Sequence, residues 1–322
     1  MGLKEEILIK LSDKTGETLS AKELSGGAFS RNAVWKVVRT LKKEGHPIEA
    51  IGGKGYRLAM AEDFPTADGI RSLCGGFDVE VYGELDSTNT LLRTRAEAGA
   101  PHGTVIIARR QRGGRGRMGR SFYSGGGGLY MSLLIRPELS ADKGGSITGV
   151  AAVAVAEAIE TVCGKDCYIK WVNDIFCGGR KVCGVLTEAA IDLESRSFRY
   201  AVIGIGLNVY APESGFPPEL EGIAGALYAY DKKKSGIMNR LAAEILQRLD
   251  RLLSDPKGAL DGYRRRCFVI GQALTACRGD TEEPFLAEDI DEDYCLVGTR
   301  ANGERAVLSS GEVRIRPEEV PI

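Results

Sequence analysis

Four arginines lie among glycines in one short stretch of the chain. Residues 111–120 read QRGGRGRMGR and contain Arg112, Arg115, Arg117 and Arg120. Clustered like charges repel one another, so such a loop gains most when it closes around a carboxylate or a phosphate. We therefore predict a mobile anion-binding loop, with a solvated surface loop as the alternative.

The glycines of this stretch also match the GxGxxG fingerprint of dinucleotide-binding proteins. That fingerprint requires a helix directly after the glycines, whereas residues 121–128, SFYSGGGG, cannot form one. Residues 129–135 instead have the composition of a strand. We therefore reject a dinucleotide fold and expect the loop to lead into a strand.

Neutral polar groups gather upstream of the arginine loop. Residues 86–89, DSTN, follow a segment predicted as a strand (79–86) and precede one predicted as a helix (90–98). Ser87 or Asn89 can cap that helix. Alternatively, these side chains bind a neutral, polar ligand at the helix N-terminus.

A third group of reactive side chains follows a buried helix predicted at residues 146–162. Residues 168–176, YIKWVNDIF, are predicted as a strand, which a Gly-Gly turn joins to a second strand at 180–186. Lys181 stands in that otherwise apolar strand, so it lies on an exposed edge or points into a ligand cleft. A further strand at 200–204 ends in glycines, which permit a close approach of backbone to ligand.

The first sixty residues carry a net charge of +4, whereas the whole chain carries −1. Their spacing predicts three helices and a hairpin, which is a winged helix-turn-helix. Arg and Asn read purine edges, and Lys and Arg neutralise phosphates. We expect DNA to meet the N-terminus and outward face of the third helix, at Ser30, Arg31, Asn32, Trp35 and Lys36. A helical domain for dimer contact or product retention is the alternative.

Composition excludes several kinds of active site. The 322 residues include only two histidines, which argues against a Ser-His-Asp triad and a His-based metal site. Eight scattered cysteines favour free thiols, and neither a secretory segment nor a bilayer-spanning run is apparent. We therefore expect a cytoplasmic protein with no membrane contact. A helix at 239–254 and short alternating segments from residue 267 predict a helical cover and a small β-barrel.

Together, these motifs resemble those of the biotin protein ligases. The resemblance rests on residues 86–89, 111–120, 170–184 and 204–208, in that order, and covers nearly the whole chain. The N-terminal segment resembles the bifunctional subclass that also represses a biotin operon. The implied fold is α+β: a winged helix-turn-helix at 1–62, a central mixed sheet with helices, as in class II synthetases, at 63–266, and an SH3-like β-barrel at 267–322.

The resemblance implies an ATP-dependent ligase that converts biotin to biotinyl-5'-AMP. It then transfers biotin to a lysine of a biotin carboxyl carrier protein, in acetyl-CoA carboxylase or another biotin-dependent carboxylase. Biotin, ATP and Mg²⁺ would bind, and the partners would be the carrier, operator DNA and a second copy in a ligand-promoted homodimer. The alternatives are a biotin-sensing repressor without strong ligase activity and a lipoate or octanoate ligase.

Roles carry over to matching positions only. By resemblance, catalysis involves Arg117 and Lys181, Asp174 meets the metal, and Asp174 is also a candidate base. The biotin-binding residues would be Ser87, Thr88, Asn89, Gln111, Arg115, Gly116, Arg117, Lys181 and Gly184. The nucleotide-binding residues would be Arg117, Arg120, Phe122, Asn173 and Asn208. Phe122 stands where the family often has Trp, and its ring would stack on adenine.

Overall fold

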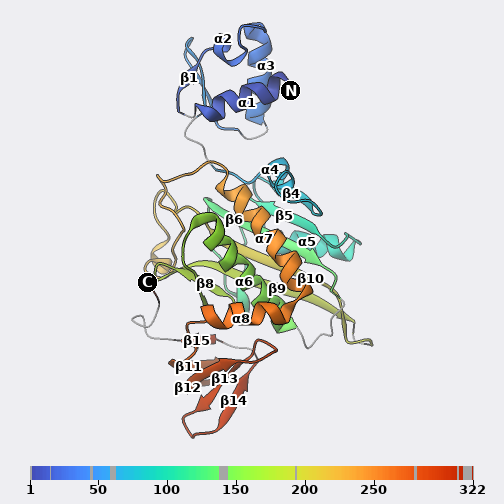
Figure 1. Ribbon diagram of the computed structural model, residues 1–322, viewed down its shortest axis with the longest axis vertical. Helices are drawn as coiled ribbons and strands as arrows, with labels where there is room; N and C mark the ends of the chain where they lie inside the picture. The colour runs from blue at the N-terminus through green and yellow to red at the C-terminus, as the bar shows by residue number, and fades with distance from the viewer. Residues whose placement is uncertain are drawn as a thin grey trace. The chain divides into compact units, whose positions relative to one another are not determined.

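A computed structural model describes residues 2–14, 16–43, 46–58, 63–137, 144–192, 194–278, 281–309, 312–314 and 321. The chain forms two compact units (Figure 1). The first comprises Met1–Asp63 and Asp231–Ser235, and the second comprises Phe64–Tyr230 and Gly236–Ile322. The boundary predicted at residue 62 lies outside the described residues, and the predicted domain limits stay predictions.

The first unit is the predicted winged helix-turn-helix. Its elements are α1 (Leu3–Asp13), β1 (Thr18–Leu19), α2 (Ala21–Leu24), α3 (Arg31–Lys43), β2 (Ile48–Ile51) and β3 (Gly55–Leu58). Ser20 forms a capping box with Glu23, and the Ser30 hydroxyl accepts a hydrogen bond from Ala33 N at 3.2 Å. Val34, Val38 and Leu41 are buried at the helical spacing. Strand β1, which pairs with β3, was not predicted.

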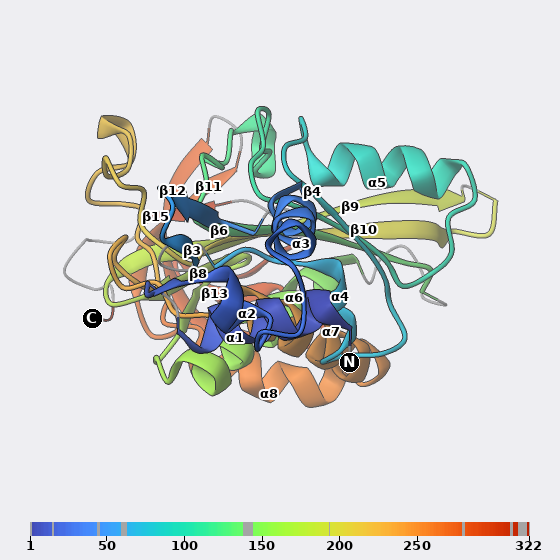
Figure 2. The ribbon, with the colours of Figure 1, turned by 90° about the horizontal axis from the view of Figure 1, so that it is seen from above.

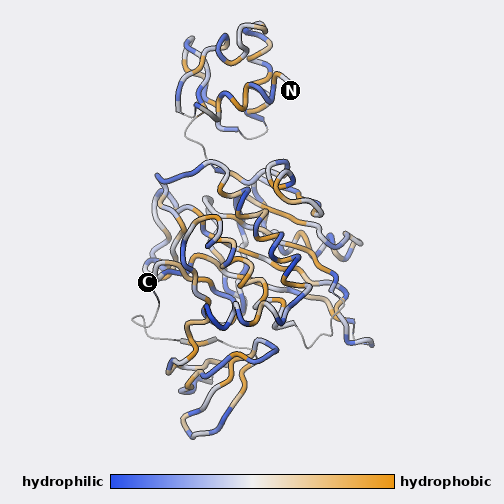
Figure 3. The backbone as a smooth tube through the Cα atoms, viewed as in Figure 1, coloured by the Kyte–Doolittle hydropathy of each residue, from blue (hydrophilic) through white to orange (hydrophobic). Residues whose placement is uncertain are grey.

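The second unit is built on a seven-stranded mixed sheet of order β4-β5-β6-β10-β9-β8-β7. Its strands are β4 (Asp78–Tyr82), β5 (Thr104–Ala108), β6 (Gly128–Ile135), β7 (Tyr168–Lys170), β8 (Asp174–Cys177), β9 (Arg180–Asp192) and β10 (Ser197–Asn208). The β4–β5 pair is parallel and the other pairs are antiparallel. Hydrophobic residues are frequent along these strands (Figure 3).

Helices cover both faces of the sheet (Figure 2). On β5, Ile106 packs with α5 (Thr88–Glu97), whereas Val105 and Ile107 pack with α6 (Gly144–Cys163) on the other face. This alternation is the two-residue period of a strand buried on both sides. The remaining helices are α4 (Ala67–Arg71), α7 (Ile237–Ser254) and α8 (Pro256–Arg266). The helices at 146–162 and 239–254 are thereby confirmed, while α4 and α8 were not predicted.

Helix α6 is long and apolar enough to cross a membrane by length and composition alone. Within the described residues it is the single helix that meets this test, and 67% of its apolar window is buried inside the protein. It contacts α7, α8 and the central sheet. Its apolar character is therefore that of a core helix.

Two strand predictions were too long. The segment 168–176 is two strands, because residues 171–173 form a turn that places Lys170 opposite Asp174. The strand predicted at 79–86 ends at Tyr82, and beyond it Leu85 makes only an isolated bridge with Gln111. Runs of apolar residues indicate extended backbone but do not reveal where it turns.

A five-stranded antiparallel sheet lies toward the C-terminus, of order β14-β13-β12-β11-β15. Its strands are β11 (Ala273–Arg278), β12 (Thr281–Ile290), β13 (Leu296–Arg300), β14 (Arg305–Leu308) and β15 (Glu312–Arg314). It belongs to the second unit. Trp171 donates its indole N–H to Tyr294 O at 3.0 Å, and the Tyr294 ring meets Tyr263 edge-on at 5.2 Å.

Candidate active site and DNA-binding face

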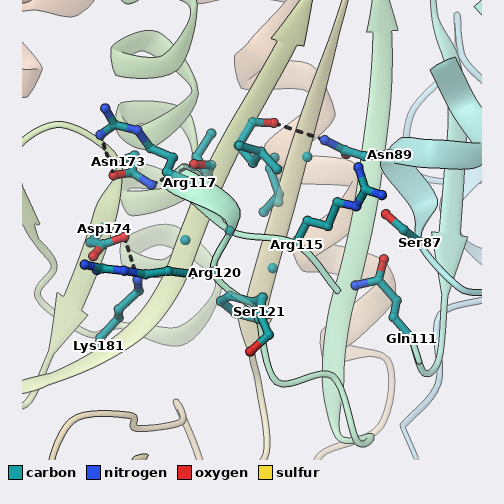
Figure 4. Close-up of a pocket in the computed structure, with 18 of the residues that line it drawn as sticks. Ser87, Asn89, Gln111, Arg115, Arg117, Arg120, Ser121, Asn173, Asp174 and Lys181 are labelled. Carbon is teal, nitrogen blue, oxygen red and sulfur yellow. Dashed lines mark hydrogen bonds and ion pairs between the residues drawn. The ribbon is translucent and has the colours of Figure 1, made fainter. Parts of the chain in front are cut away.

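One cavity of about 280 Å³ in the second unit brings nearly all of the predicted ligand-binding residues together (Figure 4). It lies where the arginine loop and the start of α5 meet β8, β9 and β10. The predicted residues that line it are Ser87, Thr88, Asn89, Gln111, Arg115, Gly116, Arg117, Arg120, Phe122, Asn173, Asp174, Lys181 and Gly184. Lys170, Trp171 and Val313 also line it and were not predicted.

Asn208 is the predicted residue that does not line the cavity. It ends β10 and is buried, and its side-chain amide donates to Gly225 O at 3.0 Å. Its backbone carbonyl accepts from Leu227 N at 3.1 Å. Asn208 therefore fastens the segment that follows β10 to the end of that strand.

One side of the cavity is strongly cationic. We use "cationic side" for Arg117, Arg120, Lys170 and Lys181 together with Asp174, which is the one carboxylate among the described lining residues. Lys170 lies opposite Asp174 in the β7–β8 hairpin, and Lys181 Nζ lies 2.7 Å from Asp174 Oδ1. This excess of positive charge suits a ligand that carries several negative charges.

The arginine loop is closed by its own backbone. Gly116 N donates to Arg120 O at 2.7 Å, and Phe122 N donates to Gly114 O at 2.8 Å. Arg117 donates to Asn173 Oδ1 at 3.2 Å, which joins the loop to the β7–β8 turn. The four arginines of the loop do not all line the cavity. Arg112 points away from it, is 72% exposed and pairs with Glu84 at 2.6 Å.

Asn173 is itself held by the sheet. The side-chain amide of Asn173 donates to Val185 O at 2.8 Å, and the backbone carbonyl of Asn173 accepts from Val185 N at 3.0 Å. Because both bonds reach β9, the oxygen that receives Arg117 has a fixed position. The turn thus positions an arginine of a different loop.

Gly184 on β9 and Gly206 on β10 line the cavity without side chains, and we call them the glycine floor. Gly184 lies opposite Gly206, and a Cβ built on Gly206 would come within 2.6 Å of the Phe122 ring. A Cβ on Gly204 would come within 2.2 Å of Asn89 Oδ1. These glycines were predicted to admit a ligand against the backbone. In the structure the room that they leave is taken by the side chains of Phe122 and Asn89.

We use "neutral side" for Ser87, Thr88, Asn89 and Gln111. Gln111 Oε1 accepts from Thr88 N at 2.8 Å and from Thr88 Oγ1 at 3.1 Å, and Gln111 Nε2 donates to Ser124 Oγ at 3.0 Å. Ser87 is the N-cap of α5, since its hydroxyl accepts from Thr90 N at 3.4 Å. Asn89 lies inside the helix, so of the two predicted caps only Ser87 is one.

Two residues that sequence reasoning missed hold the neutral side, the buried Ser132 and the half-buried Glu188. Ser132 Oγ lies 2.7 Å from Thr88 Oγ1 and 2.6 Å from Asn89 Oδ1. Glu188 accepts from Asn89 Nδ2 at 2.9 Å and pairs with Arg93 at 2.7 Å. Ser132 is a small polar residue within the otherwise mostly apolar strand GLYMSLLI, which is the same signal that singled out Lys181.

The cavity offers little to a metal ion held by protein alone. Among the described residues there is no group of three or more His, Cys, Asp or Glu that could hold one. Mg²⁺, however, commonly binds through one or two carboxylates together with phosphates of the substrate. Asp174 is placed to supply one such carboxylate, so the donor set fits an ion that arrives with ATP.

The predicted DNA-binding side chains lie on the first unit. Arg31, Asn32, Lys36 and Arg39 are exposed on α3, and Trp35 is 47% exposed. The Arg39 guanidinium lies 5.4 Å from the centre of the Trp35 ring. The outward face of α3 thus combines cations, an amide and an aromatic ring, as predicted.

In the comparison with known proteins, each of the two units matches a different family. Residues 82–208 match the biotin/lipoate A/B protein ligase family, and residues 4–57 match a family described as HTH domain. Over 234 residues the chain is 38% identical to the bifunctional ligase/repressor BirA of Bacillus subtilis, covering 70% of each chain. The chain belongs to the biotin protein ligase family.

The chain is also similar to other members of that family. The bifunctional ligase/repressor BirA of Escherichia coli is 31% identical over 198 residues, covering 61% of this chain and 58% of that one. A biotin protein ligase from Aquifex aeolicus, solved with biotin and ATP, superposes with a TM-score of 0.61 at 26% identity. That superposition covers 74% of this chain and 98% of the Aquifex chain.

Proposed function

We propose that this protein is an ATP-dependent biotin protein ligase that also binds DNA as a repressor. The observation that carries the ligase is the cavity, in which a cationic side adjoins a neutral, hydrogen-bonding side in a chain of this family. All eight cysteines are free, which suits the cytoplasm that we propose as its location.

The cationic side fits the first half-reaction. The biotin carboxylate attacks the α-phosphorus of ATP, a bond forms between carboxylate oxygen and phosphorus, and pyrophosphate leaves. Both reactants are anionic, so preorganised positive charge lowers the barrier. Lys181 would lie between the carboxylate and the α-phosphate, Arg117 and Arg120 would hold phosphate oxygens, and Mg²⁺ bound with ATP would meet Asp174.

The two uncharged parts of the product fit the remaining residues. The ureido ring of biotin needs neutral donors and acceptors, which Ser87, Thr88, Asn89 and Gln111 offer. Arg115 and Gly116 would close the loop over it, beside Gly184. Phe122, fixed on the glycine floor, would present its ring to adenine, and Asn173 would act through Arg117.

The second half-reaction needs no nucleophile from the enzyme. The ε-amine of the carrier lysine attacks the carbonyl carbon of biotinyl-5'-AMP, an amide forms, and AMP leaves with the bonding electrons. The attacking amine must lose a proton, and we propose as its acceptor Asp174, the one carboxylate among the lining residues that the structure describes. This account agrees with a chain that has only two histidines.

A mass measurement on the acceptor tests this function. The full-length protein is incubated with MgATP, biotin and a biotin carboxyl carrier domain, and the mass of the carrier is recorded. We expect one biotinyl group on one lysine, dependent on ATP, and no lipoyl group when lipoate replaces biotin. Modification by lipoate alone would favour the lipoate ligase, and no modification would favour a biotin-sensing repressor.

DNA binding is the second activity, and the match of residues 4–57 with the exposed basic face of α3 favours it. Paired helix-turn-helix units read two half-sites, so we propose a ligand-promoted homodimer on operator DNA. Affinity for DNA from upstream of a biotin operon should fall steeply with salt. Substituting Arg31 and Lys36 with alanine should weaken binding, and an unchanged gel shift would contradict the assignment.

A further inference from the structure

Two cysteines face each other at the open end of the β7–β8 hairpin. Cys167 immediately precedes β7, and Cys177 is the last residue of β8. Because Tyr168 lies opposite Phe176, Cys167 and Cys177 occupy the next opposing positions. Opposing antiparallel residues have Cα atoms about 4.5–5.5 Å apart, which lies within the range that a disulfide spans. Both thiols are free.

The two thiols have different surroundings. Cys167 is 3% exposed, whereas Cys177 is partly exposed. A hydrogen bond from the Cys167 thiol, helped by the charge of Lys165 and opposed by burial and by Asp166, lowers the pKa of Cys177 to about 7. That same bond and burial raise the pKa of Cys167, as do Glu160 and Cys183.

We propose that Cys177 and Cys167 form an oxidant-responsive dithiol, in which the exposed thiol reacts first and the buried thiol resolves it. The Cys177 thiolate attacks hydrogen peroxide, the O–O bond breaks, and a sulfenic acid and hydroxide form. Cys167 then attacks that sulfur, a disulfide forms, and the sulfenic hydroxyl group leaves as water with the proton of the Cys167 thiol. The hydroxide from the first step becomes water with the proton that the Cys177 thiol had released. Two thiols are oxidised, and one peroxide is reduced to two waters.

The pair has a defined place relative to the cavity. The turn of the same hairpin carries Trp171 and Asn173, and Lys170 and Asp174 flank it, all of which line the cavity. The disulfide would cross-link the strands at the end of the hairpin opposite this turn. The proposal concerns thiol chemistry alone and does not rest on the ligase activity.

The first test compares alkylation rates in the unmodified full-length protein. Cys163 and Cys295 are the other partly exposed cysteines among the described residues, so they serve as internal controls. In short pulses of iodoacetamide at pH 7.5, we expect Cys177 to be labelled about fivefold faster than either control, because more of it is thiolate. Equal or slower labelling of Cys177 would overturn the proposal.

The second test identifies the disulfide by mass. Trypsin cleaves after Lys165, Lys170 and Arg180, so the two cysteines fall on separate peptides, 166–170 and 171–180. After one equivalent of hydrogen peroxide we expect these peptides to be joined, and joined equally in Cys163→Ser. Cys167→Ala should leave a sulfenic acid on Cys177 that a dione probe traps, and should slow its alkylation. Disulfides among other cysteines, or none, would refute the pairing.

Discussion

The cationic and neutral sides of the cavity differ in how their polar and charged groups are partnered within the protein. On the neutral side Gln111 uses both ends of its amide on Thr88 and Ser124, and Asn89 is held by Ser132 and Glu188. On the cationic side four cations line the cavity together with Asp174, the one carboxylate among the described lining residues. The protein therefore satisfies the uncharged groups of the neutral side internally, whereas positive charge exceeds negative charge among the described residues of the cationic side.

This difference indicates how each side should respond to substitution. Hydrogen bonds between neutral groups contribute little net free energy, because water replaces them. Fixed charges inside a cavity act on charge that develops in the transition state, where they matter more. We therefore expect large kinetic effects on the cationic side and small effects, confined to biotin affinity, on the neutral side.

The largest effect is expected for Lys181→Ala. It removes the cation placed between the reacting anions and leaves Asp174 without that partner at 2.7 Å. We expect kcat/KM for adenylate formation to fall about 10²–10³-fold, with the fold retained. Lys257→Ala, at a side chain 84% exposed, is the matched control and should behave as the parent. Parent-like turnover in the Lys181 variant would remove this residue from the mechanism.

A second prediction contrasts two arginines of one loop. Arg117 lines the cavity and reaches Asn173, whereas Arg112 pairs with Glu84 outside it. We expect Arg117→Ala to lower kcat/KM for ATP about 10²-fold. Arg112→Ala should change it by less than about twofold, as for an exposed ion pair. Equal losses in both variants, measured by steady-state kinetics, would show that the loop acts only through its net charge.

The sequence allowed the lining residues of both sides to be predicted, apart from Lys170, but not the residues that hold the neutral side in place. Arginines among glycines and a lysine in an apolar strand are unusual in themselves, so Arg117 and Lys181 were found. Ser132 and Glu188 form hydrogen bonds with side chains more than forty residues away, and no local pattern shows such contacts.

The elements of the fold were also predicted unevenly, some within a few residues and others not at all. Segments such as α6 and α7 were predicted within a few residues, because the pattern of apolar residues that buries a helix is local. The turn at 171–173 was missed because Trp, Val and Asn are all compatible with a strand. Arg112 was grouped with the other arginines because spacing alone does not show that Glu84 lies beside it.

A third prediction concerns the glycine floor. In Gly206→Ala the new methyl group would come within 2.6 Å of the Phe122 ring, so the ring must shift. Crowding of this kind costs about 1–3 kcal/mol, which here would raise the KM for ATP about tenfold. Gly83→Ala meets no atom within 4 Å and is the control. If the KM for biotin rose instead, Phe122 would belong to the neutral side.

The smallest effect is expected for Thr88→Val, which keeps the shape of the side chain. It removes the hydroxyl between Ser132 and Gln111, so the KM for biotin should rise about fivefold while kcat stays the same. Thr88→Ser keeps the hydroxyl and should have the KM for biotin of the parent protein. Thr94→Val, which removes a hydroxyl that donates to Thr90 O on the same helix, is the control. A fall in kcat with an unchanged KM would contradict a binding role.

Biotin-dependent exchange of labelled pyrophosphate into ATP tests the division of the cavity most directly, because exchange requires both sides and no acceptor. The account predicts exchange with biotin and MgATP, its loss in Lys181→Ala at any biotin concentration, and its recovery in Thr88→Val at high biotin. Exchange that depends on lipoate and not on biotin, or that survives in Lys181→Ala, would contradict it.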